Sequence, residues 1–402
     1  MTIRNSVSIL VTGLLTFVVV DRSRGDESVA TDLAAIVAVR PDGVGHAEAQ
    51  AAAARLSQLE SGTVTEVLTA FDGASPLVKN WLRVITASIA DNGDFPTESL
   101  QTFLADRDGD ADARYLAFQL LTANDPESLP RLIEGAETDP SLPLRFLAIS
   151  RILDRAEREI ADGDREAAVA TLKKVLAEGR SPEQLKSAAK SLEGLDQPVD
   201  LAAELALVRD WWILGTYDNT DSQHFGTVYL PESTYLETNR LPADWLAPGA
   251  AIRRGDVSDQ VPAGQVARRV TSDDSLGLVD INPPFENAKD AIVYGYIEFT
   301  LDPERFADGS DRIAAEARLG CITANKVWVN GKMVTANEVY HSGTRIDQYI
   351  GECQLQPGLN TVLVKVCQNA QTESWAQDWR FQFRFTEPSG AALPIETTTP
   401  AE

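Results

Sequence analysis

The period of the apolar residues changes once along this chain, at Asp210–Asn219, and the change separates a helical part from a strand part. From about Ser28 to Leu207 the apolar residues recur three and four positions apart, which is typical of amphipathic helices. Beyond Asp210 they alternate with polar residues, and glycine and proline become frequent. We therefore expect an α + β multidomain protein, helical over 28–207 and an antiparallel β-sandwich over 208–387.

The helical part carries an internal repeat. Apolar stripes begin at Val78, Ala113 and Leu144, so successive starts are 113 − 78 = 35 and 144 − 113 = 31 residues apart. That is the length of a helix pair with two short loops, and each pair would bury its stripe only against the next pair. The sequence predicts a HEAT-like α-solenoid. Near its end, Ser181 followed by Gln184 predicts a capping box at the start of the last long helix.

The strand part is clearest at Asn330-Gly331, which suits a two-residue type I′ turn between two apolar runs. With this pair as the loop, Trp328 would face Met333 and Val327 would face Val334. Other strands are predicted at Ile292–Phe299, Ile313–Leu319, Tyr349–Leu355, Thr361–Cys367 and Trp379–Phe385. Six of the seven tryptophans follow the change of period, which a large aromatic core would explain.

The two ends of the chain are predicted to lie outside these regions. Arg4 precedes an apolar run, Val7–Val20, that is short for a membrane span, so residues 1–25 are predicted to be a signal peptide cut before Asp26. An uncleaved anchor stays open as the alternative. Residues 388–402 are rich in Pro, Thr, Ala and acid without periodicity, which predicts a disordered tail.

The net charge of the chain limits the classes of molecule that it can bind. The net charge is −24 and the pI is about 4.5, so the protein repels nucleic-acid phosphates and anionic lipid heads. We expect no nucleic-acid partner and, once the signal is removed, peripheral or no membrane contact. Export would place the protein in the periplasm, at the cell surface or outside the cell.

Three cysteines, Cys321, Cys353 and Cys367, leave two states open. An exported protein could pair two of them, or all three could be buried thiols acting as small apolar residues. If Pro357-Gly358 closes a hairpin, Cys353 and Cys367 stand at different distances from the turn and would not face each other.

Metal and cofactor motifs are not evident. The acidic segment 106–112 has its glycine at the fourth position, where a calcium loop of the EF-hand type needs it at the sixth, so a solvated turn is the better interpretation and a structural calcium ion stays the alternative. His46, His224 and His341 stand in unlike contexts, with no zinc-ligand spacing around them. No cofactor is therefore expected.

Several stretches resemble a known family. Lys326–Lys332 and Gln356–Val366, followed by the aromatic last strand, are similar to the jelly-roll domains of the galactose-binding-like fold. Asn80–Arg83 and Ala113–Ala117 resemble the HEAT-like repeats that precede such a domain in exported bacterial proteins of unassigned function. Residues 215–219 read Gly-Thr-Tyr-Asp-Asn where a Gly-Pro-Phe-Asp-Asn form is expected. The resemblance implies secretion and binding, with no particular sugar, and carries no catalytic residue.

Function is therefore a choice among hypotheses. The favoured one is an exported, non-catalytic binding protein whose sandwich takes a glycan, with Trp375 as a stacking ring and Gln377, Arg345 and His341 as hydrogen-bond partners. A second is a protein partner bound along the helical repeats. A third, a glycosidase using the carboxylates of Glu373 and Asp378, has little support, because a chain with 60 acidic residues places some near tryptophan by chance.

Overall fold

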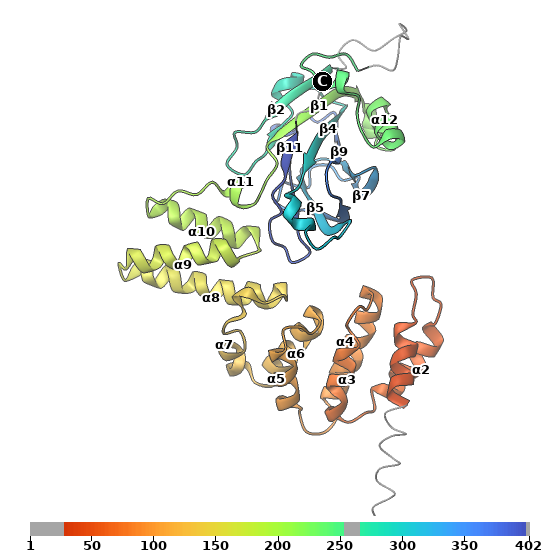
Figure 1. The fold of residues 1–402 in the computed structure, drawn as a ribbon, viewed down its shortest axis with the longest axis vertical. Helices are drawn as coiled ribbons and strands as arrows, with labels where there is room; N and C mark the ends of the chain where they lie inside the picture. Colours follow the sequence, from red (N-terminus) through yellow and green to blue (C-terminus); the bar gives the residue numbers. More distant parts are fainter. Residues whose placement is uncertain (1–27, 253–265, 399–402) are drawn as a thin grey trace, which may run out of the picture. The chain divides into compact units, whose positions relative to one another are not determined.

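The computed structural model describes residues 28–252 and 266–398, and the predicted signal peptide lies outside them. The fold is α + β, with helices and two antiparallel sheets (Figure 1). The chain divides into two compact units, one up to Ala148 and one from Ile149. This division falls within α8 (Leu142–Ala161), whereas the helices give way to strands at Asp210, where the sequence period changes. Within the described ranges, no helix combines the length and apolarity that a bilayer span needs.

The first unit is a run of short helices that share one apolar core. They are α2 (His46–Leu56), α3 (Val64–Thr69), α4 (Pro76–Ala90), α5 (Thr97–Ala105), α6 (Ala111–Asn124), α7 (Leu129–Leu132) and the start of α8. Helices α3 and α4 lie side by side, as do α5 and α6 (Figure 1). The first residues of the three predicted stripes, Val78, Ala113 and Leu144, are all buried in this core. The sequence thus placed the first residue of each stripe in the core of this unit.

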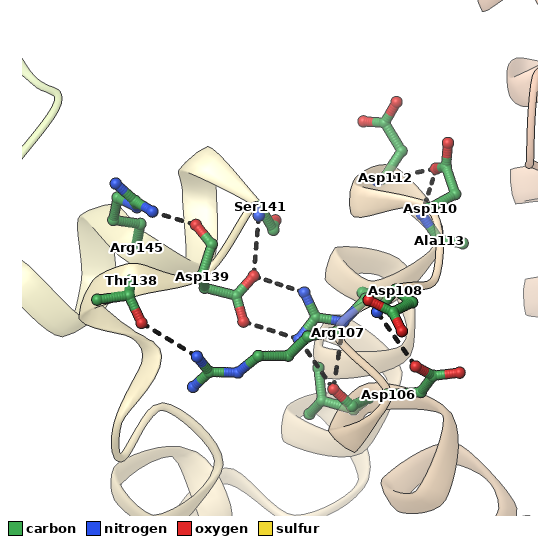
Figure 2. A network of polar contacts seen from close by, with 12 residues as sticks. Asp106, Arg107, Asp108, Asp110, Asp112, Ala113, Thr138, Asp139, Ser141 and Arg145 are labelled. Atoms are coloured by element: carbon green, nitrogen blue, oxygen red, sulfur yellow. Dashed lines mark hydrogen bonds and ion pairs between the residues drawn. The ribbon is translucent and has the colours of Figure 1, made fainter. Parts of the chain in front are cut away.

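A buried polar network holds the later helices of this unit together (Figure 2). Asp139 accepts hydrogen bonds from the amide of Ser141 at 2.8 Å and from the Arg114 guanidinium at 2.5 and 2.7 Å, while its carbonyl accepts from Arg145 Nε at 2.9 Å. Arg114 and Asp139 are 2% and 3% exposed. The two arginines are 145 − 114 = 31 residues apart, the same interval that separates the apolar stripes starting at Ala113 and Leu144.

The second unit begins with the rest of α8, followed by α9 (Arg165–Glu178), α10 (Pro182–Gly194) and α11 (Leu201–Glu204). The predicted capping box is wrong. The side chain of Ser181 makes no cap bond, and Gln184 Nε2 instead donates to Ser150 Oγ of α8 at 2.9 Å. Gln184 is buried and its Nε2 donates to the neighbouring helix, so the side chain does not reach back over its own N-terminus.

Two sheets complete the second unit. The larger has the order β2 (Val266–Thr271), β1 (Asp210–Asp218), β4 (Ala291–Thr300), β9 (Asn360–Gln368), β6 (Asn325–Val329) and β7 (Lys332–Asn337), with β11 (Glu396–Thr398) beside β4. The smaller has the order β3 (Val279–Asp280), β10 (Arg380–Thr386), β5 (Ile313–Cys321) and β8 (Tyr349–Leu355). Every pair is antiparallel, as expected for a sandwich.

The larger sheet is covered on both faces. One apolar cluster, with Trp211, Trp379 and Phe381, takes residues from both sheets, so the sheets pack face to face. The second cluster lies on the other face of β1, β4 and β9 and includes Trp212, together with Tyr235 of α12 (Leu230–Thr238). This explains why β4 and β9 are almost uninterrupted runs of buried residues. It also explains the tryptophan bias, since five tryptophans are core residues here: Trp211, Trp212, Trp245, Trp328 and Trp379.

The Asn-Gly hairpin is confirmed with one correction. Asn330 and Gly331 have φ of 49° and 75°, both positive as a type I′ turn requires, and Trp328 pairs with Met333. Val327, however, pairs with Thr335 and not with Val334, because the register shifts between Val327 and Trp328. A bulge of this kind cannot be read from alternation alone.

Pro357-Gly358 does not close a hairpin. It connects β8 in the smaller sheet to β9 in the larger one, so Cys353 and Cys367 stand in different sheets. All three cysteines are free and buried, which is the thiol alternative. Burial raises the pKa of Cys321 to about 11 and those of Cys353 and Cys367 to about 12, so these thiols stay protonated and unreactive at neutral pH.

The predicted disordered tail is wrong for residues 388–398. Leu393 is fully buried in the core between the sheets, its amide donates to the carbonyl of Phe385 at 3.0 Å, and β11 pairs with residues 298–300 of β4. Composition misled because two apolar residues, Leu393 and Ile395, anchor an otherwise polar segment. Residues 399–402 lie outside the described part.

Candidate functional site

Three loops meet at one end of the sandwich, and we call them the loop edge: residues 219–229 after β1, 338–348 before β8, and 368–378 after β9. Their junction is Asn219, which is fully buried. Its Nδ2 donates to the Tyr340 hydroxyl at 3.0 Å and to the Gln368 carbonyl at 2.9 Å, and its Oδ1 accepts from the His224 amide at 3.3 Å. One amide therefore ties all three loops to each other.

Two of the predicted ligand-binding residues come to this edge. His341 Nε2 lies 3.0 Å from Asn369 Oδ1, which brings the loop of His341 against the 368–378 loop. Gln377 is half-buried, and its carbonyl accepts from Gln368 Nε2 at 3.3 Å and from Asn282 Nδ2 at 3.0 Å. The sequence did not show that these loops are neighbours.

The other two predicted residues are Arg345, in the 338–348 loop, and Trp375, in the 368–378 loop. Arg345 is exposed, and among the described residues it makes no hydrogen bond or ion pair with His341 or Gln377. Its carbonyl oxygen lies so close to β5 that a Cβ at Gly320 would collide with it, which fixes the course of this loop. Trp375 lies in the short 3-10 helix Ser374–Ala376, but its side chain is outside the described part.

A buried ammonium group fixes the first loop. Lys365 of β9 is fully buried, and its Nζ donates to the carbonyls of Phe225 at 2.9 Å and Thr227 at 2.6 Å and to the carboxylate of Glu232 at 3.3 Å. Glu232 is 3% exposed and also accepts from the Tyr294 hydroxyl at 2.8 Å. Burial lowers the pKa of Lys365, while the charge of Glu232 opposes that shift. The Lys365–Glu232 pair, through the bonds from Lys365 to the two carbonyls, therefore holds the 219–229 loop close to the sheet.

The carboxylates considered for hydrolysis have other roles or none. Asp378 Oδ2 pairs with the Arg380 guanidinium at 2.7 Å, and Glu373 is exposed. Nothing in this geometry shows a shared reaction centre between them.

The acidic segment 106–112 caps a helix (Figure 2) and also forms ion pairs. The Asp110 carboxylate accepts from the amides of Asp112 and Ala113 at 2.9 and 3.1 Å, so it caps α6. Lys79 Nζ lies 2.7 Å from Asp110 and 2.9 Å from Asp112. Over the described residues, no group of three or more His, Cys, Asp or Glu side chains converges as metal ligands would.

Another cleft of the second unit lies away from the loop edge. It has a volume of about 750 Å³ and runs between α10 and the loop at Ser275-Leu276. Its charges largely neutralise each other: Arg209 pairs with Asp200 at 2.6 Å, and Lys186 lies 3.5 Å from Glu183. The cleft therefore selects no ligand by charge.

No protein-family model matches this chain, and no curated protein matches it. Among solved structures, one described as "putative beta-galactosidase" from Bacteroides fragilis is 16% identical over 23% of this chain and 15% of its own, with a TM-score of 0.15. A GH31 alpha-xylosidase from Xanthomonas citri is 13% identical over 33% of this chain and 14% of its own, with a TM-score of 0.17. Similarities this low carry no functional argument.

The sequence missed the residues that organise the edge, which are Asn219, Glu232, Tyr340, Lys365 and Asn369. One signal was present. Lys365 is a lone cation within the apolar strand Asn360–Gln368, and a charge in such a strand needs a buried partner.

Proposed function

We propose that this protein is an exported binding protein whose sandwich takes a polar ligand, a glycan, at the loop edge. The observation that carries this proposal is the contact between His341 and Asn369, which joins two loops rich in amide, imidazole and hydroxyl groups. Such groups bind sugar hydroxyls when a rigid scaffold holds them, and the buried Asn219 supplies that rigidity. The proposal includes the galactose-binding-like jelly roll as the finer description of the sandwich.

A glycan array with the full chain tests this function. We expect retention on a defined set of sugars by the parent and loss with His341→Ala and with Asn369→Ala. His46→Ala, in the first unit, is the matched control and should retain binding. An array that is silent for the parent, or one that His341→Ala leaves unchanged, would contradict the proposal.

Trp375→Ala tests the stacking ring separately. A platform ring should be required for retention while its loss costs less than about 1 kcal/mol of stability, whereas a core tryptophan would cost about 3–5 kcal/mol. A large fall in melting temperature with unchanged retention would remove Trp375 from the site.

A second function, binding of a protein partner by the first unit, rests on a different observation. Apolar side chains stay exposed on its helices, with Val84 67% and Phe146 46% accessible. We infer that the helix pairs form a HEAT-like solenoid and that this surface receives an exported protein. Val84→Glu should abolish capture of that partner without lowering stability, and a partner still captured by Val84→Glu would exclude this surface.

A further inference from the structure

The loop after β1 aligns a hydroxyl, an imidazole and a carboxylate. Thr227 Oγ1 lies 3.1 Å from His224 Nδ1, and His224 Nε2 lies 3.2 Å from Asp218 Oδ2. We propose that Thr227, His224 and Asp218 form a nucleophile, general base and orienting carboxylate that hydrolyse small acyl esters. This activity is independent of the proposed glycan binding, because it needs no ligand at the other two loops.

The contacts select the imidazole tautomer that a general base needs. Asp218 Oδ1 accepts from the Thr220 hydroxyl at 2.6 Å and from the Thr220 amide at 2.9 Å, and these bonds lower the pKa of Asp218. An ionised carboxylate only accepts hydrogen bonds, so Nε2 of His224 carries the proton. Nδ1 is then the acceptor and faces the Thr227 hydroxyl, which is the arrangement that activates an alcohol.

The buried ammonium of Lys365 orients the backbone beside the nucleophile. It draws the carbonyls of Phe225 and Thr227 inward at 2.9 and 2.6 Å. Because both following peptide bonds are trans, the next amides, those of Gly226 and Val228, point away from the Lys365 ammonium group. In the described part of the chain these two amides donate to no other group. Two free N–H groups on either side of Thr227 can stabilise a developing oxyanion.

Access favours a short acyl group. The side chains of His224 and Asp218 are 35% and 56% exposed, and a Cβ at Gly226 would meet nothing within 4 Å. Such an open site gains little by burying a long chain, so acetyl esters are the substrate class that fits best.

The reaction balances with water as the only co-reactant. Thr227 Oγ1 attacks the ester carbonyl carbon while its proton passes to His224 Nδ1, and the carbonyl oxygen becomes the oxyanion that the two amides face. Collapse of this intermediate breaks the bond to the alkoxy oxygen, which leaves as the alcohol with the proton from Nδ1. Water then attacks the acyl-threonine and gives a proton to Nδ1, which returns it to Thr227 Oγ1 as the bond to the acyl group breaks. Acetic acid leaves and ionises to acetate in solvent.

The test uses the full chain with p-nitrophenyl acetate, following release of p-nitrophenol and the mass of the peptide that contains Thr227. We expect an acetyl group on that peptide, and roughly a 100-fold loss of rate in Thr227→Val and His224→Gln. Thr227→Ser should keep the activity and His46→Ala should leave it unchanged.

Two controls distinguish loss of the nucleophile from loss of the fold. Circular dichroism of Thr227→Val must match the parent, and Thr227→Ser supplies the nucleophile again if the valine variant misfolds. A parent that releases p-nitrophenol no faster than Thr227→Val, or acetyl groups found only on lysines or the N-terminus, would overturn the proposal.

Discussion

Replacing Lys365 by Met tests the electrostatic centre of the second unit. The substitution keeps the length and apolar stem of the side chain but removes the ammonium group that the carbonyls of Phe225 and Thr227 and the Glu232 carboxylate share. Glu232 is 3% exposed and would be left without its counter-charge. Breaking a buried pair in this way costs about 3–5 kcal/mol. For a unit of this size that corresponds to a fall in melting temperature of roughly 10 °C.

Tryptophan fluorescence during urea or thermal unfolding measures this cost, since six of the seven tryptophans follow residue 210. Lys326→Met is the matched control, because Lys326 pairs with Lys365 in the sheet register and its Nζ lies 4.6 Å above the Phe225 ring. Loss of that contact should cost only about 0.5–1 kcal/mol. Glu232→Gln in the Lys365→Met background should recover part of the loss by removing the unpaired charge. If Lys365→Met is no less stable than Lys326→Met, the buried pair does not hold the loop as we infer.

Four further outcomes are expected. Leu393→Ala should lower the free energy of unfolding in urea by about 2–5 kcal/mol, whereas Ser389→Ala should leave it almost unchanged. Equal effects of the two substitutions would show that this segment is not packed in the core. Asp347 accepts from Arg318 at 2.7 Å and from Arg384 at 2.5 Å, so Asp347→Ala should cost about 3–5 kcal/mol, and a change under about 1 kcal/mol would contradict that pairing. Burial raises the pKa of the Cys367 thiol from 9.0 to about 12, so its contribution to stability is complete below pH 9 and is lost as the pH rises through 12. The melting temperature measured by calorimetry should therefore fall less steeply at alkaline pH in Cys367→Ala than in the parent. Melting temperatures that fall in parallel would refute this. The intact mass of the exported protein should match a chain that begins at Asp26. A mass that matches a chain beginning at Met1 would indicate an anchor.

The sequence predicted the helices, most strands and the Asn-Gly turn because each depends on local periodicity and turn chemistry. It failed where a distant contact decides the outcome. The bond from Gln184 to Ser150 and the pairing of β11 with β4 depend on neighbours far along the chain, and the bulge beside Trp328 is a one-residue shift that alternation does not record. Spacing carries no information on such pairs.

The candidate site shows the same limit more strongly. His341 and Gln377 were named from their residue types, but the groups that bring their loops together, Asn219 and Asn369, are ordinary amides with no sequence signature. The relation between Thr227 and His224 was also invisible, because three residues of spacing in a loop has no fixed geometry.

The strand order has a consequence for synthesis on the ribosome. β1 needs β4 beside it and β4 needs β9, so the centre of the larger sheet cannot close until Gln368 has been made, 368 − 218 = 150 residues after β1 ends. At usual elongation rates this interval lasts roughly 8–30 s. Through that time the adjacent rings of Trp211 and Trp212 lack the strands that later cover them, while the helices before them can already form from local contacts. The yield of folded protein therefore depends on whether the exposed apolar surface of the incomplete sheet is protected from aggregation while the chain is still being synthesised.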